Sequence, residues 1–238
     1  MKGGGDAPVG AQEAVSELGK IVLGDEPLDA ILERIVHLAK NVLPASVEAS
    51  ITLLTMTKAE TFAFTGELAI ELDERQYETD RGPCLDAAAT GNRIWVRDMA
   101  RETRWPAFAA SAAARGVRCS LSIPLPVQRD VTGALNFYDL EGRAFDERSI
   151  ELAETFAAHA AVAVANARLY DSTATLARQM QQAMATRAVI EQAKGILMRD
   201  RGCDADEAFD ALVALSQQSH LKLREVAQRL VDQVSKGE

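Results

Sequence analysis

Apolar residues recur at two different spacings over the first two thirds of the chain, and the changes of spacing predict its elements. Residues 11–43 repeat apolar side chains every three and four positions, which predicts helix, and Pro27 occupies a position that a first helical turn tolerates. Alternating apolar and polar residues then predict strands at 49–56, 61–65, 94–96, 118–127 and 132–139. Residues 145–168 return to the helical spacing. This order predicts an α+β domain with one antiparallel sheet flanked by helices.

The helical pattern continues beyond this domain without glycine or proline until Gly195, which predicts a long linking helix. Apolar residues fall there at every seventh position, namely Val162, Leu169, Leu176, Ala183, Ile190 and Leu197. A coiled coil needs a second set of apolar positions in the same seven-residue repeat, but this set is mostly polar here. Its members are Asn166, Thr173, Met180 and Arg187. The mixed seam leaves open whether this helix pairs with a second copy of the chain.

Two further helices follow Gly202. Asp204 with Glu207 three residues later has the spacing of a capping box, which predicts a helix start. The expected inner face of this helix is Ala208, Phe209, Leu212 and Leu215. After a short turn, a last helix presents Leu223, Val226, Ala227, Leu230 and Val234. The end of the linking helix and these two helices are expected to close a small all-α core.

Length and composition agree with two folded domains, which we place at residues 11–170 and 171–238, with residues 1–10 disordered. A chain of 238 residues exceeds the usual size of one domain, and 47% hydrophobic with 26% charged residues is the balance of a globular protein. No segment has the pattern of a signal peptide or a membrane-spanning helix, so we expect a cytoplasmic protein without membrane association. Three widely spaced cysteines predict neither a disulfide framework nor a zinc site.

The net charge of −9 argues at first against a nucleic-acid partner. The acid lies mostly in the first domain, because residues 1–170 carry 17 basic and 25 acidic side chains, whereas residues 171–238 carry 9 and 10. Local positive surfaces are therefore compatible with the C-terminal part of the chain.

The C-terminal part resembles an ANTAR domain over nearly all of the segment ATRAVIEQAKGILMRDRGCDADEAFDALVALSQQSHLKLREVAQRLV. The resemblance is carried by the R-x-x-I-x-x-A-K-G-I-L-M run from Arg187, the E-A-F triplet from Glu207 and the K-L-R-E-V-A run from Lys222. It implies binding of paired RNA hairpins in leader transcripts, so that transcription reads through a terminator. Two hairpins would need two such domains, which a homodimer supplies.

Candidate RNA contacts come from basic and small residues of this segment. Arg187 and Lys194 are seven residues apart and therefore share a helix face. Gly195 lies within a predicted helix, where glycine is about 1 kcal/mol less favourable than alanine, so its small size is expected to allow close approach of another backbone or a base. The full candidate set is Arg187, Gln192, Ala193, Lys194, Gly195, Arg199, Lys222 and Arg224. We expect Phe209 in the core, so that no aromatic platform for base stacking remains.

The N-terminal part resembles a GAF domain through ELDERQYETDRGPCLDA, RWPAFAASAAARGVRCSLSIPL and GALNFYD. The resemblance implies a sensor with a pocket between the sheet and a covering segment, for an unknown small-molecule ligand. Candidate pocket residues are Tyr77, Cys84, Trp95, Trp105, Phe108 and Phe137, although such residues are more often plain core. For Cys84 a buried apolar role is favoured over a redox role.

Catalysis has no support in the sequence. His37, His159 and His220 lie in separate predicted helices, and phosphate-loop, dinucleotide and metalloprotease motifs are absent. No cofactor and no metal site are evident. Two alternatives to an RNA-binding antiterminator stay open: a helix-turn-helix regulator that reads duplex DNA, and a dimeric sensor that acts through protein partners.

Overall fold

The computed structural model describes residues 11–22, 26–43, 47–55, 58–128 and 131–235. These residues form two compact units that divide between Asp171 and Ser172. The predicted disordered segment 1–10 lies outside the described residues. Among the helices of the described residues, none combines the length and the hydropathy that spanning a membrane requires.

The first unit is built on a five-stranded antiparallel sheet in the order β2-β1-β5-β4-β3. The strands are β1 (Val47–Leu54), β2 (Ala59–Phe64), β3 (Ile94–Val96), β4 (Cys119–Gln128) and β5 (Val131–Asp139). All five predicted strands are confirmed, with bounds that differ from the predicted ones by at most two residues. The period of two is a local signal, so the strands could be predicted before their pairing was known.

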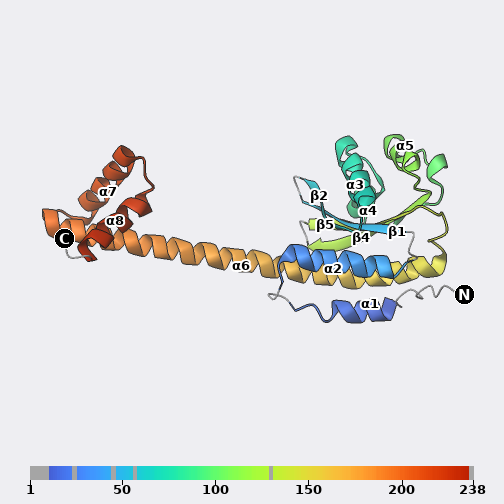
Figure 1. Cartoon of the computed structure of the whole chain (residues 1–238), viewed down its shortest axis with the longest axis horizontal. Helices are drawn as coiled ribbons and strands as arrows, with labels where there is room; N and C mark the ends of the chain where they lie inside the picture. Colours follow the sequence, from blue (N-terminus) through green and yellow to red (C-terminus); the bar gives the residue numbers. More distant parts are fainter. Residues whose placement is uncertain (1–10, 23–25, 44–46, 56–57, 129–130, 236–238) are drawn as a thin grey trace, which may run out of the picture. The chain divides into compact units, whose positions relative to one another are not determined.

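Helices cover both faces of this sheet (Figure 1). One face carries α2 (Leu28–Asn41) and the first part of α6 (Glu147–Arg201), with α1 (Ala11–Leu18) packed outside them. The opposite face carries α3 (Glu67–Thr79), α4 (Pro83–Thr90) and α5 (Pro106–Ala114), and a short 3₁₀ helix η1 (Met99–Arg101) precedes α5.

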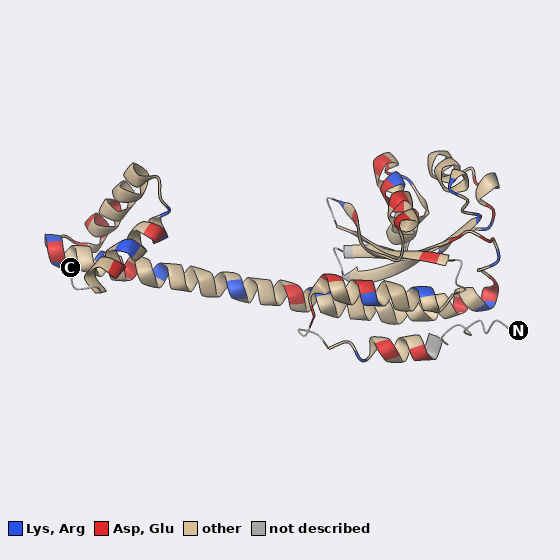
Figure 2. Cartoon of the chain, viewed as in Figure 1, with Lys and Arg blue, Asp and Glu red and all other residues tan. Residues whose placement is uncertain are grey.

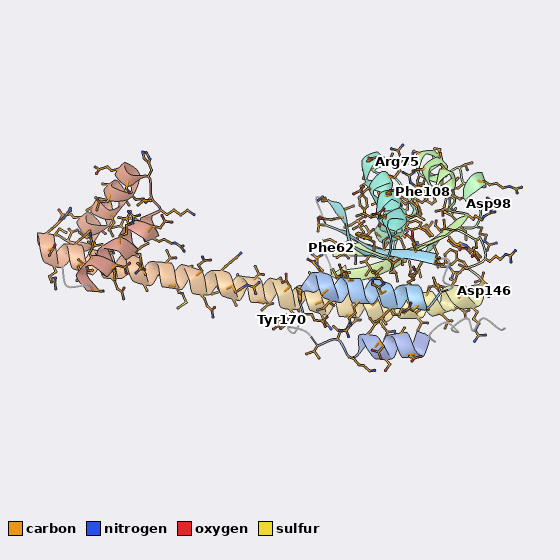
Figure 3. All side chains as sticks on the ribbon, in the orientation of Figure 1. Phe62, Arg75, Asp98, Phe108, Asp146 and Tyr170 are labelled. Carbon is orange, nitrogen blue, oxygen red and sulfur yellow. The ribbon has the colours of Figure 1, made fainter. Side chains whose placement is uncertain are left out.

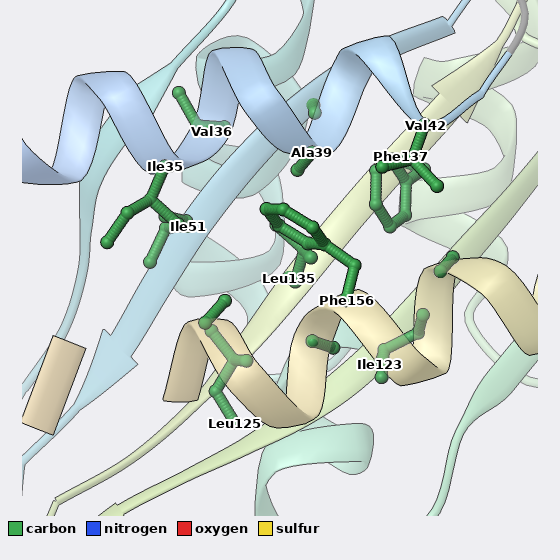
Figure 4. Close-up of a cluster of buried hydrophobic side chains, with 14 of the residues drawn as sticks. Ile35, Val36, Ala39, Val42, Ile51, Ile123, Leu125, Leu135, Phe137 and Phe156 are labelled. Atoms are coloured by element: carbon green, nitrogen blue, oxygen red, sulfur yellow. The ribbon is translucent and has the colours of Figure 1, made fainter. Parts of the chain in front are cut away.

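The two faces of the sheet differ in chemistry. Apolar side chains of β1, β4 and β5, such as Ile51, Ile123 and Phe137, pack with Ile35 of α2 and Phe156 of α6 into the main core (Figure 4). Because strand side chains alternate, the next residues along each strand point the other way, towards α3 and α4. These are polar, namely Ser50, Thr52, Ser120, Ser122 and Asn136, and all are buried.

The helix predicted over residues 11–43 forms as two helices, and the predicted place of Pro27 at the start of a helix is confirmed. The chain forms α1 up to Leu18 and starts α2 at Leu28, with Pro27 in an extended conformation as its N-cap. Proline has no backbone N–H and disfavours helix at the residue before it, so Pro27 opens the second helix instead of continuing the first.

The second unit consists of the end of α6 with α7 (Ala205–Ser219) and α8 (Leu223–Ser235). The predicted capping box is confirmed: the Asp204 carboxylate accepts from the backbone N–H groups of Asp206 and Glu207, and the Glu207 carboxylate accepts from the N–H of Asp204. The core contains Ala193, Leu197, Ala208, Leu212 and Ala227 as fully buried residues. Phe209, Leu215 and Val234, which we predicted to face inwards, are exposed instead.

Candidate functional site

The predicted RNA contacts on the second unit are mostly accessible. The exposed members are Arg187, Gln192, Gly195, Arg199, Lys222 and Arg224. Ala193 is fully buried among α7 and α8, so its predicted contact with RNA is wrong. Its small side chain serves helix packing, which the spacing of small residues in the sequence could not distinguish from a surface role.

Lys194 is less available than Arg187 although both lie on one face of α6. Its side chain is 16% exposed, and its Nζ forms an ion pair with Glu191 Oε2 at 3.2 Å. An RNA phosphate would have to compete with this carboxylate. The structure therefore makes Arg187 the better candidate of the two.

Gly195 is open to solvent. Apart from its chain neighbours and the backbone of its own helical turns, a methyl group at its position would meet no atom of the described residues within 4 Å. A glycine within a helix often lets another helix pack closely, but no helix among the described residues of this unit packs against Gly195. Gly195 lies about 80° around α6 from Arg187, so the two residues are on adjoining faces of the helix.

A groove runs over the second unit where α6, α7 and α8 meet, with a volume of about 520 Å³. We call it the arginine groove, because Arg187 of α6 and Arg224 of α8 both line it. Its other lining residues are Gln179, Gln182, Ala183, Thr186, Ile190, Glu191 and Phe209. Figure 2 shows basic and acidic residues interspersed on this unit, so the two arginines form a local positive site and not part of a wide basic face.

The first unit has a second candidate site, a buried polar cluster between the sheet and α3. The carboxylate of Asp73 on α3 accepts hydrogen bonds from Tyr138 Oη at 2.5 Å and from Thr61 Oγ1 at 2.9 Å. Tyr77 Oη lies 2.8 Å from Thr52 Oγ1 and 2.7 Å from Thr61 Oγ1. Thr52 Oγ1 also donates to Asp73 Oδ2 at 3.4 Å, so donors from β1, β2 and β5 converge on one carboxylate.

Gln76 connects this polar cluster to α4. Its side-chain oxygen accepts from the backbone N–H of Cys84 at 2.9 Å, and its amide nitrogen donates to Tyr138 Oη at 3.2 Å. A side chain at Gly82 would collide with Gln76, so glycine is needed for the close approach of this loop. The first turn of α4 is therefore held to the sheet through Gln76.

Burial raises the pKa of Asp73 to about 6, although hydrogen bonds from Ser50, Tyr138, Thr61 and Thr52 act to lower it. No basic side chain forms an ion pair with this carboxylate within the described residues. Three acceptor atoms on the same face of the sheet, Ser120 Oγ, Ser122 Oγ and Asn136 Oδ1, are buried and have no hydrogen-bond partner in the described part of the chain. The face of the sheet beneath α3 and α4 therefore carries several buried oxygen atoms that accept no hydrogen bond from the described residues.

The predicted pocket residues do not lie together. Phe137 and Trp95 pack in the core on the α2 and α6 side of the sheet, so their assignment to the pocket is wrong. Trp105 and Phe108 form a separate apolar cluster beneath α5, where Figure 3 shows Phe108. Tyr77 and Cys84 lie at the buried polar cluster.

Cys84 is fully buried, and burial raises the pKa of its thiol well above the usual value. The predicted burial of Cys84 is therefore confirmed, although the thiol also has a side-chain hydrogen bond with Thr52. Sequence reasoning missed Asp73, Gln76 and the serine and threonine residues of the sheet, because polar residues at every second strand position usually face water.

Comparison with protein families decides the identity of both units. A GAF domain model matches residues 25–165, which is more than half of the chain, and an ANTAR domain model matches residues 178–231. The chain is a GAF and ANTAR domain protein. GAF domains are sensor domains and ANTAR domains bind RNA in antitermination, so the pair of domains is that of a regulatory protein. A comparison with curated protein sequences finds no significant match.

Solved structures show the same fold for the GAF domain. The GAF domain of a phosphoenolpyruvate-protein phosphotransferase from Coxiella burnetii is 19% identical, with 68% of this chain and 94% of that chain covered and a TM-score of 0.51. A free methionine-R-sulfoxide reductase from Neisseria meningitidis in complex with its substrate is 17% identical, with 67% and 88% covered and a TM-score of 0.51. A phycocyanobilin-bound GAF domain of a cyanobacterial phytochrome is 14% identical, with 68% and 98% covered and a TM-score of 0.51. These proteins differ in what they do, so the shared fold identifies no ligand or activity for this chain.

Proposed function

We propose that this protein is a signal-responsive transcription antiterminator that acts in the cytoplasm and is not an enzyme. Its ANTAR domain binds paired hairpin loops in leader transcripts, and its GAF domain controls this binding in response to a small molecule. The observation that carries the proposal is the arginine groove, which places Arg187 and Arg224 from two helices on one surface within the segment that matches the ANTAR family. Guanidinium groups bind phosphate oxygens in bidentate geometry, which suits the backbone of a folded loop.

The test is a titration of the full-length protein with a labelled RNA that carries two stem-loops, chosen from a pool with randomised loop sequences. We expect tighter binding to this RNA than to a scrambled RNA of equal length. Arg187→Ala and Arg224→Ala are each expected to weaken binding about tenfold and to lower the salt slope by roughly 0.7 for each lost phosphate contact. Arg229→Ala is the matched control, because Arg229 is exposed on α8 but does not line the groove.

Equal binding to the two RNAs would contradict the proposal. Preference for duplex DNA in a competition experiment would favour the helix-turn-helix alternative instead. Unchanged RNA affinity in both arginine variants would exclude the arginine groove as the site.

Dimerisation belongs to the proposal, because two hairpins need two ANTAR domains. Leu176, Met180 and Met184 are exposed apolar residues of α6, and their spacing of four residues places them on one side of the helix. We propose that this side pairs with α6 of a second copy. Leu176→Glu is expected to shift the protein from dimer to monomer in sedimentation velocity, whereas Arg178→Glu, at an exposed position on the opposite side of α6, leaves the dimer intact. A monomeric wild-type protein at micromolar concentration would contradict this part of the proposal.

A further inference from the structure

Phe209 occupies an unexpected place on the surface of the ANTAR domain. It is 40% exposed, while its neighbour Ala208 and the next inward residue, Leu212, are fully buried. One residue corresponds to about 100° around a helix, so the ring of Phe209 lies beside the core and not within it. There it forms one wall of the arginine groove.

The remaining walls of the groove bring three kinds of group to this ring. Arg187 and Arg224 supply cations, Gln179 and Gln182 supply amides with both donors and acceptors, and Ile190 supplies apolar surface. Neither arginine forms an ion pair within the described residues, so both guanidinium groups are available to phosphate. The acid in the groove, Glu191, is already engaged by Lys194.

This combination matches the chemistry of an unpaired nucleotide. A base has an apolar face that stacks on an aromatic ring, edges that exchange hydrogen bonds with amides, and phosphates on either side. A base inside a duplex has both faces covered by its neighbours, whereas a hairpin loop can turn a base outwards. An exposed aromatic ring beside two free arginines is therefore suited to a loop base and not to a stem.

We propose that Phe209 stacks on one unpaired base of the bound loop while Arg187 and Arg224 hold the flanking phosphates. This inference rests on the proposed function and extends it, because it assigns recognition to the loop and names the side chain that reads it. It also reverses the expectation from the sequence that the domain has no stacking surface.

The experiment is a double-mutant cycle between the protein and the RNA. The full-length wild-type protein and Phe209→Leu are titrated with the selected two-stem-loop RNA and with versions in which each loop position in turn is abasic. We expect Phe209→Leu to weaken binding of the intact RNA about tenfold, with an unchanged salt slope. At one loop position, removal of the base should weaken binding to the wild-type protein by a similar factor and have no further effect on Phe209→Leu.

Two variants separate stacking from folding. Phe209→Trp keeps an aromatic face and is expected to retain affinity, and Leu215→Ala removes another exposed apolar residue of α7 without touching the groove. Amide hydrogen exchange of α7 and α8 should be the same in wild-type protein and in Phe209→Leu, because the ring is not in the core.

The possible outcomes distinguish the two levels of the proposal. If the wild-type protein does not prefer the stem-loop RNA to scrambled RNA, the proposed function fails. If the preference is present but Phe209→Leu binds as tightly as the wild type, or every abasic position affects both proteins equally, stacking alone is overturned. If Phe209→Leu changes the sedimentation of the RNA-free protein, the groove is a contact between copies of the chain and the stacking role is also overturned.

Discussion

Truncation of Leu212 to alanine is expected to destabilise the ANTAR domain by about 2–5 kcal/mol, whereas the same change at Leu215 should cost less than about 1 kcal/mol. Leu212 is fully buried and Leu215 is 39% exposed, although both lie on α7 three residues apart. Three of the fully buried residues of this core, Ala193, Ala208 and Ala227, are alanines. Leu212 therefore supplies a large share of the apolar surface that such a small domain buries.

Hydrogen exchange followed by mass spectrometry on the full-length protein gives the measurement, because it reports each domain separately. In Leu212→Ala, amides of α7 and α8 should lose most of their protection, while those of β1, β4 and β5 keep theirs. Leu215→Ala should behave as the wild-type protein does. Equal protection of α7 amides in the two variants would show that Leu212 contributes no more to the core of this domain than Leu215 does.

The second large effect is expected at Asp73, whose burial makes the stability of the GAF domain depend on pH. The pKa of Asp73 is about 6 in the folded protein and 3.8 in the unfolded chain. The folded state therefore binds the proton more tightly than the unfolded state does. The stabilising contribution of the protonated carboxyl is thus fully present below about pH 4 and is lost as the pH rises through 6. The difference between these two pKa values corresponds to a free-energy change of roughly 3 kcal/mol.

Asp73→Asn removes this titration and keeps the size of the side chain. The free energy of unfolding of the wild-type protein, relative to that of Asp73→Asn, should fall by roughly 3 kcal/mol between pH 4 and pH 7. Urea unfolding monitored by tryptophan fluorescence reports the GAF domain, because Trp95 and Trp105 are the two tryptophans of the chain. Glu74→Gln is the matched control, since Glu74 is the adjacent residue of α3 and is exposed. A difference that stays constant with pH would mean that Asp73 is not buried as a carboxyl group in solution.

Local signals explain what could be predicted. The strands, the start of α7 at its capping box and the continuity of α6 depend on residues that are neighbours in sequence, and these predictions are confirmed. The helix predicted at 11–43 is divided in two for a local reason as well, because Pro27 starts a helix more readily than it continues one.

The burial of Asp73 follows a different rule. The sequence ELDERQYE has the pattern of a solvent-exposed acidic helix. Polar residues at alternate positions of β1, β4 and β5 have the pattern of a solvent-exposed sheet face. The structure sets these two polar surfaces against each other, so that Tyr138 and Thr61 of the sheet donate hydrogen bonds to Asp73 of the helix. Pattern analysis assumes that polar residues face water, and it fails where two polar surfaces are buried together.

By itself the sequence determined the elements, the order of the two domains and the two family resemblances, because these depend on periodicity, caps and motifs along the chain. Only the tertiary structure decided which of two nearby residues on a helix is buried: Ala208 and not Phe209, Leu212 and not Leu215, Asp73 and not Glu74. Helical periodicity locates an apolar face to within about one residue, or 100°. The exact angle at which a helix meets its neighbours depends on residues distant in sequence, and that angle determines both the core and the groove beside it.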